Sequence, residues 1–319
     1  MHVVITGGSG FLGQRVVRTL AERGTIAGRS GGQKPITGFT LIDTAEPAFV
    51  AQGGTAHVGD ITDAAFLAQA VPANTTHVFH LAAVVSGQAE AEYDTGIQVN
   101  LRATEQLLDL LRQHAATPRV VFTSSVAVFG DAPAIIEDST AALPRSSYGT
   151  QKAMAELLIN DMSRKGFIDG ISLRVPTVVV RPGKPNAAAS SFASAIIREP
   201  LSGERAACPV DPGMLMWIAS PDAVTRNLVH AADLPADDLG FPRILNLPGL
   251  SVPVSEMIAA MVRAGGAETL IDHQIDPAIE DIVGTWPDGM NTLRANELGF
   301  VPDDDIDAIV AAYSEDSGQ

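Results

Sequence analysis

A tyrosine and a lysine stand four positions apart in this sequence, at Tyr148 and Lys152. On a helix, side chains at that spacing lie on one face, one turn apart. An ammonium group favours the phenolate form of a neighbouring tyrosine, so we expect Lys152 to lower the pKa of Tyr148 from its usual value of about 10 towards neutral pH. Such a pair can take a proton from an alcohol as a general base. It also occurs on solvated helix faces without any chemical role.

Two serines, Ser124 and Ser125, lie at the end of a β-branched segment, and residues 120–124 are predicted to form a buried strand. Open α/β sheets bind their ligands at the carboxyl ends of the strands. The two hydroxyl groups are therefore candidates for contact with a ligand.

Glycines recur at Gly7, Gly10 and Gly13, between a predicted buried strand over residues 2–6 and a predicted amphipathic helix over residues 11–23. A side chain at these positions would block a tight turn, the approach of the backbone to a pyrophosphate, and the packing of helix on strand. The free amides at the start of the helix then face the negative charge of the phosphates. The pattern predicts a dinucleotide site rather than a plain turn.

An acidic residue, Asp43, closes the second predicted strand, over residues 40–43. A carboxylate at this place can accept hydrogen bonds from both ribose hydroxyls and repels a 2′-phosphate, which favours NAD over NADP. Two alternatives remain open at this stage. Asp43 could be a simple turn residue, and Arg29 could approach a 2′-phosphate from the glycine-rich loop that we predict between residues 25 and 38.

Strand-like and helical segments alternate up to about residue 180, which predicts an α/β fold with a doubly wound, Rossmann-type parallel sheet. Further strands are expected over residues 56–59, 77–82 and 171–179, and helices over 63–70, 96–113 and 148–165. A proline-rich break follows Arg181. We expect a cofactor domain at 1–182, joined again by 218–248, and a smaller substrate lobe at 183–217 and 249–319.

The formal net charge is −16, which argues against nucleic acid or an anionic membrane as a partner. The sequence starts without the basic flank and long apolar stretch of a signal peptide, so a cytoplasmic protein is expected. Cys208 is the single cysteine, which excludes an internal disulfide and a multi-thiolate zinc site. The histidines have no metal-ligand spacing, and no metal is expected.

Together, the glycine turn, the serine pair ahead of Phe129 and Gly130, and the tyrosine–lysine helix resemble the extended short-chain dehydrogenase/reductase family, also described as the NAD-dependent epimerase/dehydratase family. The resemblance covers residues 1–182. It implies NAD as cofactor, Ser125 as catalytic hydroxyl, Tyr148 as base and Lys152 on the nicotinamide ribose. It implies a homodimer that pairs through helices 96–113 and 148–165. The cofactor contacts that it implies are Gly7, Gly10, Phe11, Leu12, Gly13, Asp43, Asp60, Ile61, Leu81, Ala82, Ala83, Asn100, Tyr148, Lys152 and Pro176.

Within that family, dehydratases carry two acidic residues after the catalytic hydroxyl, whereas Val126 and Ala127 follow it here. Residues 174–186 and 216–221 resemble instead a branch whose members oxidise the C2 hydroxyl of a four-carbon sugar acid such as D-erythronate. A small sugar acid needs a cation for its carboxylate and polar partners for its hydroxyls. The candidates for these substrate contacts are Ser86, Ser124, Ser125, Tyr148, Arg181 and Asn186. An NAD-dependent nucleotide-sugar 4-epimerase is the alternative reading, since the core motifs do not exclude it.

Overall fold

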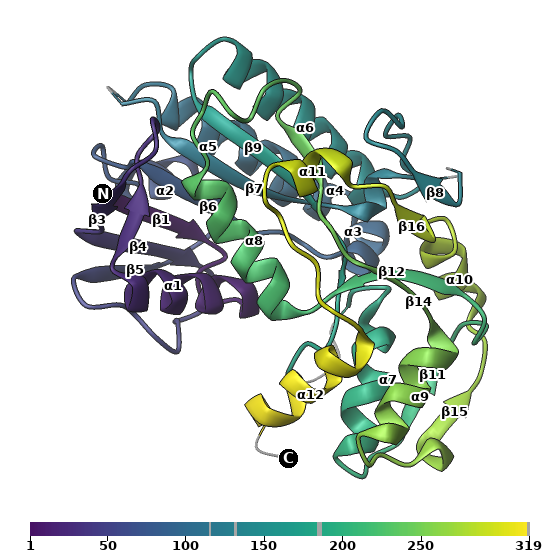
Figure 1. Ribbon diagram of the computed structural model, residues 1–319. Coiled ribbons are helices and arrows are strands. Elements are labelled where there is room, and N and C mark those ends of the chain that lie inside the picture. The colour runs from purple at the N-terminus through teal and green to yellow at the C-terminus, as the bar shows by residue number, and fades with distance from the viewer. Residues whose placement is uncertain (115, 131–132, 184–186, 318–319) are drawn as a thin grey trace.

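The computed structural model of the protein describes residues 1–114, 116–130, 133–183 and 187–317. At its centre is a seven-stranded sheet in the order β13-β9-β7-β6-β1-β4-β5, in which neighbouring strands pair in parallel (Figure 1). The strands are β1 (His2–Thr6), β4 (Gly38–Asp43), β5 (Gly54–Val58), β6 (His77–His80), β7 (Arg119–Ser125), β9 (Asp169–Val175) and β13 (Ile244–Asn246).

Helices cover both faces of this sheet because its strands are apolar on both sides. Val3 and Ile5 of β1 share a hydrophobic cluster with helix residues that include Val16 and Leu228, whereas Val4 between them belongs to a cluster with residues of other helices. The first layer is α1 (Phe11–Arg23) and α8 (Pro221–Asp233), and the second is α2 (Ala64–Ala70), α5 (Ala103–Leu111) and α6 (Ser147–Arg164).

The strand order reverses between β1 and β6. From β1 the chain passes to β4 and β5 on one side, and then returns to β6 on the other side. In such a sheet the crevice outside the carboxyl ends of the two central strands is the place where ligands bind. The predicted doubly wound α/β fold is confirmed, and its crevice lies between Thr6 and His80.

The chain leaves the large sheet at Pro176, because a proline has no N–H group with which to continue a strand. The strand predicted over residues 171–179 is confirmed up to Val175 but extends too far: β9 (Asp169–Val175) ends there, and β10 (Thr177–Val178) pairs with β12 in a second sheet. That sheet contains β10, β12 (Leu215–Ala219) and β14 (Leu250–Pro253).

A smaller lobe surrounds this second sheet and has a hydrophobic cluster of its own, which includes Val180, Phe192, Met216 and Met257. Figure 1 places three of the helices that follow β10, namely α7, α9 and α12, below the large sheet. The further elements after β10 are α7 (Ser191–Leu201), β11 (Ala206–Cys208), α9 (Val254–Arg263), η3 (Glu268–Leu270), β15 (Ile271–His273), α10 (Pro277–Val283), β16 (Gly289–Met290), α11 (Leu293–Glu297) and α12 (Ile306–Ser317).

Two other regions differ from the sequence-based expectation. The predicted glycine-rich loop contains a hairpin, with β2 (Thr25–Ala27) antiparallel to β3 (Gln33–Pro35). The predicted helix over residues 96–113 is divided into α4 (Tyr93–Gly96), a π-helical segment η1 (Ile97–Arg102) and α5. Short elements elsewhere are α3 (Ser86–Ala91), η2 (Val126–Val128) and β8 (Ile135–Ile136), which pairs with β16.

Within the described ranges, no helix combines the length and the apolar character needed to cross a bilayer. The same residues contain no group of three or more His, Cys, Asp and Glu side chains that could hold a metal ion. Cys208 is buried in the lobe.

Candidate active site

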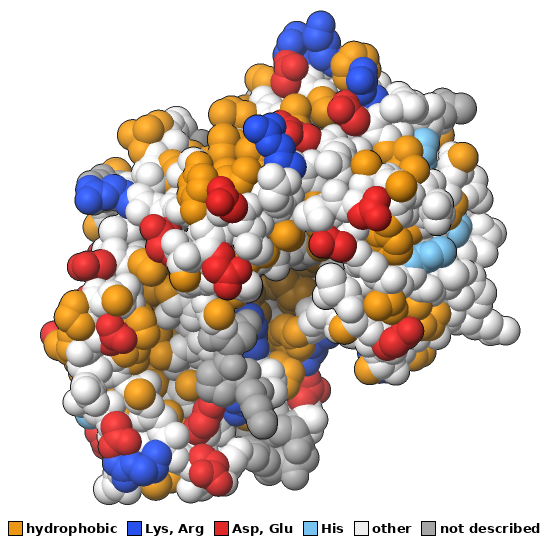
Figure 2. Space-filling view, turned by 180° about the vertical axis from the view of Figure 1, so that it is seen from behind, with side chains coloured by type: hydrophobic (Ala, Val, Ile, Leu, Met, Phe, Trp, Pro, Cys, Tyr) orange, Lys and Arg blue, Asp and Glu red, His pale blue; other side chains and the backbone are white. Residues whose placement is uncertain are grey.

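A cavity of about 710 Å³ lies over the carboxyl ends of the central strands and reaches into the smaller lobe. Figure 2 shows a hollow between the two parts of the molecule, with hydrophobic side chains inside it and basic side chains at its edge. Of the residues predicted from sequence, those that line the cavity are Gly7, Gly10, Phe11, Leu12, Gly13, Asp43, Asp60, Ile61, Leu81, Ala82, Ala83, Ser86, Ser124, Ser125, Tyr148, Lys152, Pro176 and Arg181.

The turn after β1 has room for backbone but not for side chains. Gly7 has φ +72°, and a Cβ atom there would lie 2.8 Å from the backbone nitrogen of Ala82. A Cβ atom on Gly13 would lie 2.2 Å from the carbonyl oxygen of Gly7. Because Gly10 is the N-cap of α1, the free amides of that helix begin at the cavity. This is the cradle that a dinucleotide pyrophosphate requires, and the residues present fit NAD.

The Asp43 carboxylate holds the same turn in place. Its Oδ2 atom accepts a hydrogen bond from the backbone N–H of Ser9 at 2.9 Å, and its Oδ1 atom accepts one from the N–H of Thr44 at 2.7 Å. Each carboxylate oxygen has a further lone pair, so ribose hydroxyls can still donate to it. A turn role and a ribose role for Asp43 are therefore compatible.

Arg29 lies away from the cavity, at the amino ends of the strands, whereas the cavity lies at their carboxyl ends. It follows β2, whose Ala27 carbonyl contacts the Nε2 atom of His77, the first residue of β6. Its own carbonyl accepts a hydrogen bond from Ala236, just beyond α8. The suggestion that Arg29 approaches a 2′-phosphate is thus wrong, because the hairpin holds it at the amino ends of the strands.

Asn100 stands behind the cavity wall and not in it. Its Oδ1 atom accepts from the Val84 N–H at 2.8 Å, and its Nδ2 group donates to the Val84 carbonyl at 3.1 Å and to the Gln151 side chain at 2.7 Å. Val84 lines the cavity whereas Asn100 does not. The structure therefore favours the alternative that Asn100 is a buried polar residue satisfied by backbone. Asn186 falls outside the described residues.

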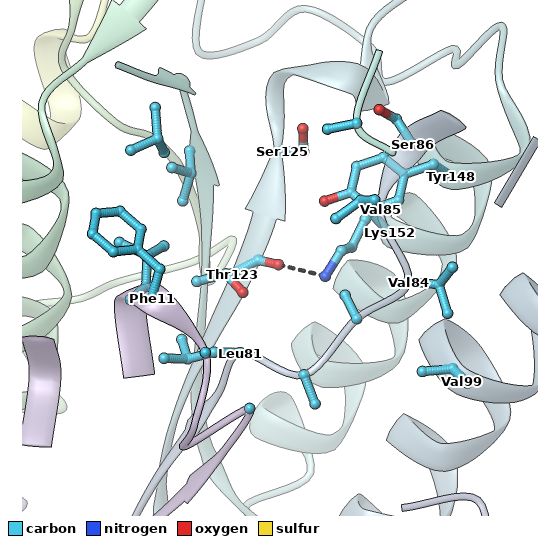
Figure 3. A pocket seen from close by; sticks show the side chains of 18 of the residues that line it. Phe11, Leu81, Val84, Val85, Ser86, Val99, Thr123, Ser125, Tyr148 and Lys152 are labelled. Carbon is cyan, nitrogen blue, oxygen red and sulfur yellow. Dashed lines mark hydrogen bonds between the residues drawn. The ribbon is translucent and has the colours of Figure 1, made fainter. Parts of the chain in front are cut away.

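Helix α6 brings Tyr148 and Lys152 into the cavity opposite the end of β7, as Figure 3 shows. The Tyr148 ring lies beside Ser125 in the cavity. The Lys152 Nζ atom donates to the Thr123 carbonyl at 2.8 Å and lies 5.6 Å from the centre of the Tyr148 ring. The helix begins at the N-cap Ser146, whose hydroxyl accepts from the Gly149 N–H at 3.1 Å.

The expectation that Lys152 lowers the pKa of Tyr148 is wrong. Burial raises the pKa of Tyr148 to about 12, and the neighbouring Ser125 hydroxyl and the charge of Arg181 oppose this only in part. Burial also lowers the pKa of Lys152 to about 7, with the negative charge of Glu156 acting in the other direction. Helical spacing made the two residues neighbours, but the loss of water around them dominates both values.

The candidate substrate contacts come from several elements. Arg181 follows β10, where its N–H donates to the Ser194 hydroxyl at 3.0 Å and its carbonyl accepts from Arg198 at 2.6 Å. The Ser86 hydroxyl, at the start of α3, accepts from the Ala189 N–H at 3.0 Å. Ser124 instead donates its hydroxyl to Glu156 at 2.5 Å, so its proton is used within the protein.

Sequence reasoning missed Trp286, which enters the cavity from the segment between α10 and β16. Trp217, which we considered as a cap of the pocket, is buried and donates its indole N–H to the Leu247 carbonyl at 3.3 Å. Nothing in the local sequence around Trp286 indicates that it lines the cavity. It lies more than a hundred residues beyond the Tyr148–Lys152 pair, so no motif connects it with that pair. Gln88 and Ser190 are further polar residues of the lining.

Comparison with known proteins gives full-length relatives. The chain is 50% identical to the D-erythronate dehydrogenase of Cupriavidus necator, over 100% of this chain and 99% of the relative. It is 42% identical to the D-erythronate dehydrogenase of Haemophilus influenzae, over 99% of both. A solved structure described as the nucleoside-diphosphate-sugar epimerase from Agrobacterium tumefaciens has a TM-score of 0.90 at 40% identity, and covers 99% of this chain and 94% of that one.

The GalE-like L-threonine dehydrogenase from Cupriavidus necator has the same fold, with a TM-score of 0.87 at 24% identity over 99% of this chain and 100% of that one. The family described as the NAD dependent epimerase/dehydratase family matches residues 3–235. That range contains the glycine turn after β1, the end of β7 and the Tyr148–Lys152 face of α6. The chain belongs to the NAD-dependent epimerase/dehydratase family.

Proposed function

We propose that this protein is an NAD-dependent dehydrogenase that oxidises a secondary hydroxyl, at C2, of a small sugar acid such as D-erythronate to the 2-oxo acid. The observation that carries the proposal is the meeting of Ser125, Tyr148, Lys152 and Arg181 in one cavity beside the dinucleotide cradle. Two full-length relatives named D-erythronate dehydrogenase support the same substrate class.

Each of these side chains has a task in that oxidation. Ser125 holds the substrate oxygen, and Tyr148 accepts the proton of the same hydroxyl. Lys152 supplies positive charge beside the tyrosine, and Arg181 binds the carboxylate of the acid. When bound, NAD would supply the hydride acceptor and a positive charge that favours the phenolate form of Tyr148. Because Lys152 is buried, its charge acts more strongly than it would in bulk solvent.

For the cofactor, we propose that the backbone around Gly7, Gly10 and Gly13 receives the pyrophosphate and that Asp43 accepts the ribose hydroxyls. Asn100 acts indirectly, by holding Val84 in the cavity wall. The other residues proposed to line the cofactor are Phe11, Leu12, Asp60, Ile61, Leu81, Ala82, Ala83 and Pro176.

A nucleotide-sugar 4-epimerase is the second candidate, because a 40% identical solved structure is described as a nucleoside-diphosphate-sugar epimerase. The number of positive charges in the cavity argues against the epimerase. Among its described lining residues, Lys152 and Arg181 carry the positive charges. If Lys152 serves Tyr148, one guanidinium remains for the substrate, which suits a single carboxylate better than a diphosphate. A volume of about 710 Å³ also leaves little room beside a dinucleotide for a second nucleotide.

The test is a substrate panel with purified protein and NAD. D-erythronate, its stereoisomers and longer aldonic acids are followed by NADH absorbance, and UDP-sugars by separation of their epimers. Reduction of NAD with D-erythronate is the expected result. Interconversion of UDP-sugars without net NADH, together with no oxidation of any aldonic acid, would overturn the proposal.

Arg181→Met provides the matched control for the carboxylate. It is expected to raise KM for D-erythronate at least tenfold, since a charge-assisted contact is lost. Its activity towards erythritol, the neutral analogue without a carboxylate, should stay at the level of the unaltered protein. Equal losses with both substrates would mean that Arg181 supports the fold of the lobe and not the substrate.

We also propose that residues 1–182 and 218–248 form the cofactor domain and that residues 183–217 and 249–319 form the substrate lobe.

We further propose that the protein works in the cytoplasm and that it is a homodimer. Leu157 on α6 and Tyr93 on α4 are 65% and 59% exposed, so an apolar surface is available on the helices expected to pair. Light scattering after size-exclusion chromatography tests the dimer. Leu157→Glu should give the mass of one chain, and cell fractionation tests the location.

A further inference from the structure

Three successive residues at the end of β7 each face a different residue of α6. Tyr148 lies beside Ser125 (Figure 3), Lys152 donates to the Thr123 carbonyl, and Glu156 accepts from the Ser124 hydroxyl. The three helix residues are spaced by four, so they form one stripe along α6. Tyr148 and Lys152 are accounted for by the proposed proton transfer, whereas Glu156 is not.

Glu156 is a buried carboxylate with a full set of partners. It is 1% exposed, and its Oε1 atom accepts from Ser124 at 2.5 Å and from the Arg174 Nε group at 2.9 Å. Its Oε2 atom accepts from the Arg174 Nη2 group at 2.8 Å. Arg174 also donates to Asn246 of β13 at 3.3 Å and lies over the Phe129 ring. The carboxylate is therefore fixed in position on both sides, by β7 and by β9.

Glu156 follows Lys152 by one helical turn on the same face of α6, and Lys152 is itself 2% exposed. Two other ionisable side chains lie near Lys152, namely Tyr148 on α6 and His80 on β6. Arg174 on β9 lies on the other side of Glu156, with which it forms an ion pair. Arg181 of the lobe faces Tyr148. Burial keeps His80 and Tyr148 neutral at neutral pH, because it lowers the pKa of the first to about 3 and raises that of the second to about 12. Glu156 is thus the anion of this group.

We propose that Glu156 is a positioning residue for the proposed oxidation: it holds the end of β7 against α6, and its negative charge favours the ammonium form of Lys152. The inference rests on the proposed function, since it assigns Glu156 to the same proton transfer. Burial by itself lowers the pKa of Lys152, and the carboxylate acts against that effect. Without Glu156, we expect the lysine to lose its proton at a lower pH than in the unaltered protein.

If the ion pair between Glu156 and Arg174 had only a structural role, the contacts of Glu156 would be the same. The test therefore measures the protonation of Lys152. The chain has four lysines, Lys34, Lys152, Lys165 and Lys184, which makes lysine resonances easy to assign by substitution. Protein labelled with ¹³C-lysine is titrated by NMR, and the Cε shift of Lys152 reports its protonation. In Glu156→Gln, the midpoint for Lys152 is expected about one pH unit lower than in the unaltered protein.

Two variants serve as controls for this titration. Ser124→Ala removes a hydrogen bond of Glu156 but keeps its charge, and Asp161→Asn removes an exposed charge elsewhere on α6. Both should leave the Lys152 midpoint within a few tenths of a pH unit. An unchanged midpoint in Glu156→Gln, or an equal fall in Ser124→Ala, would overturn the inference.

The same variants are then assayed with D-erythronate across pH. In Glu156→Gln, the alkaline limb of kcat/KM should move about one pH unit lower, with a roughly tenfold loss above the new midpoint. If the unaltered protein does not oxidise any aldonic acid, the proposed function fails while the NMR titration still decides the charge relation. If it does oxidise D-erythronate and the limb of Glu156→Gln stays in place, the inference alone fails.

Glu156→Gln leaves Arg174 without its carboxylate and could prevent folding. Arg174→Met then provides a test of opposite sign. It removes the cation that balances Glu156, so the Lys152 midpoint is expected to rise. A midpoint that stays or falls in Arg174→Met would overturn the inference.

Discussion

The Thr6 hydroxyl and the Nδ1 atom of the His80 imidazole are 2.7 Å apart, and their hydrogen bond joins the last residues of β1 and β6. These are the two strands on either side of the cofactor crevice. The Thr6 hydroxyl also accepts from the Ala82 N–H at 3.4 Å. Through this contact, the glycine turn and the segment facing it across the crevice are held at a set separation.

Thr6→Val is therefore expected to weaken NAD binding about fivefold, the effect of losing one buried hydrogen bond. Calorimetric titration with NAD measures the Kd. The matched control is Thr104→Val, which removes the other bond of the same imidazole, 2.8 Å long and made with α5 behind the sheet. That control should lower stability without changing Kd. Equal weakening in both variants would mean that His80 acts only through the general stability of the fold.

Asp43→Asn is expected to reduce the preference for NAD over NADP at least tenfold, because the carboxylate no longer repels a 2′-phosphate. The ratio of kcat/KM for the two cofactors is the measurement. Asp60→Asn is the control, since Asp60 also lines the cavity and accepts from the Thr62 N–H at 2.8 Å. A larger change of the ratio in Asp60→Asn would move the discriminating contact to that residue.

Lys152→Met is expected to stabilise the protein without ligands at pH 7 while abolishing turnover. Burial lowers the pKa of Lys152 from 10.5 to about 7, so between these values the unfolded chain binds a proton that the folded chain does not. The contribution of Lys152 to stability is therefore complete above pH 10.5 and is lost as the pH falls towards 7. Relative to Lys152→Met, the unaltered protein should gain on the order of 3 kcal/mol between pH 7 and 9.5.

Urea denaturation at both pH values measures this difference. The range ends at pH 9.5 because the pKa of Tyr148 is raised to about 12, and this residue begins to contribute above its usual value of 10.0. If the free energy of unfolding changed by the same amount between pH 7 and 9.5 in the unaltered protein and in Lys152→Met, Lys152 would not be desolvated as described.

Trp286→Ala is expected to extend oxidation to aldonic acids longer than four carbons, because the indole closes the lobe side of the cavity. The kcat/KM for D-erythronate should fall as contact area is lost, and that for five- and six-carbon acids should rise. Trp286→Phe keeps most of the wall and should retain the preference for the short acid. No change in chain-length preference for either variant would exclude Trp286 from the substrate contacts.

Much of the cofactor side could be predicted from sequence because its determinants are local. Gly7, Gly10 and Gly13 serve one turn, and helical spacing places Lys152 one turn from Tyr148 wherever the helix lies. Trp286 and the partners of Glu156 depend on contacts between distant segments, which no local pattern contains. The pKa of Tyr148 belongs to the same class, since it depends on burial more than on its sequence neighbour.

The boundaries that were predicted wrongly have a common origin in backbone hydrogen bonding. Pro176 ended β9 although the β-branched residues continued beyond it, because a missing N–H outweighs side-chain preference. The hairpin of β2 and β3 forms in a glycine-rich segment where strand propensity is low. It is tied to α8, because the Ala27 N–H donates to Asp233 at 2.8 Å.

Different hydrophobic clusters hold the two walls of the cavity. Helix α6, with Tyr148 and Lys152, packs on the large sheet, whereas Val180 beside Arg181 belongs to the cluster of the smaller lobe. Trp286 packs against the lobe cluster and also against the cluster that contains Val126 and Phe129 after β7. Substitutions in the lobe away from Trp286 can thus alter which acid is accepted while the residues of the proton transfer keep their packing. Proteins that diverge from one such chain can therefore acquire new substrate specificities while they retain the same catalytic mechanism.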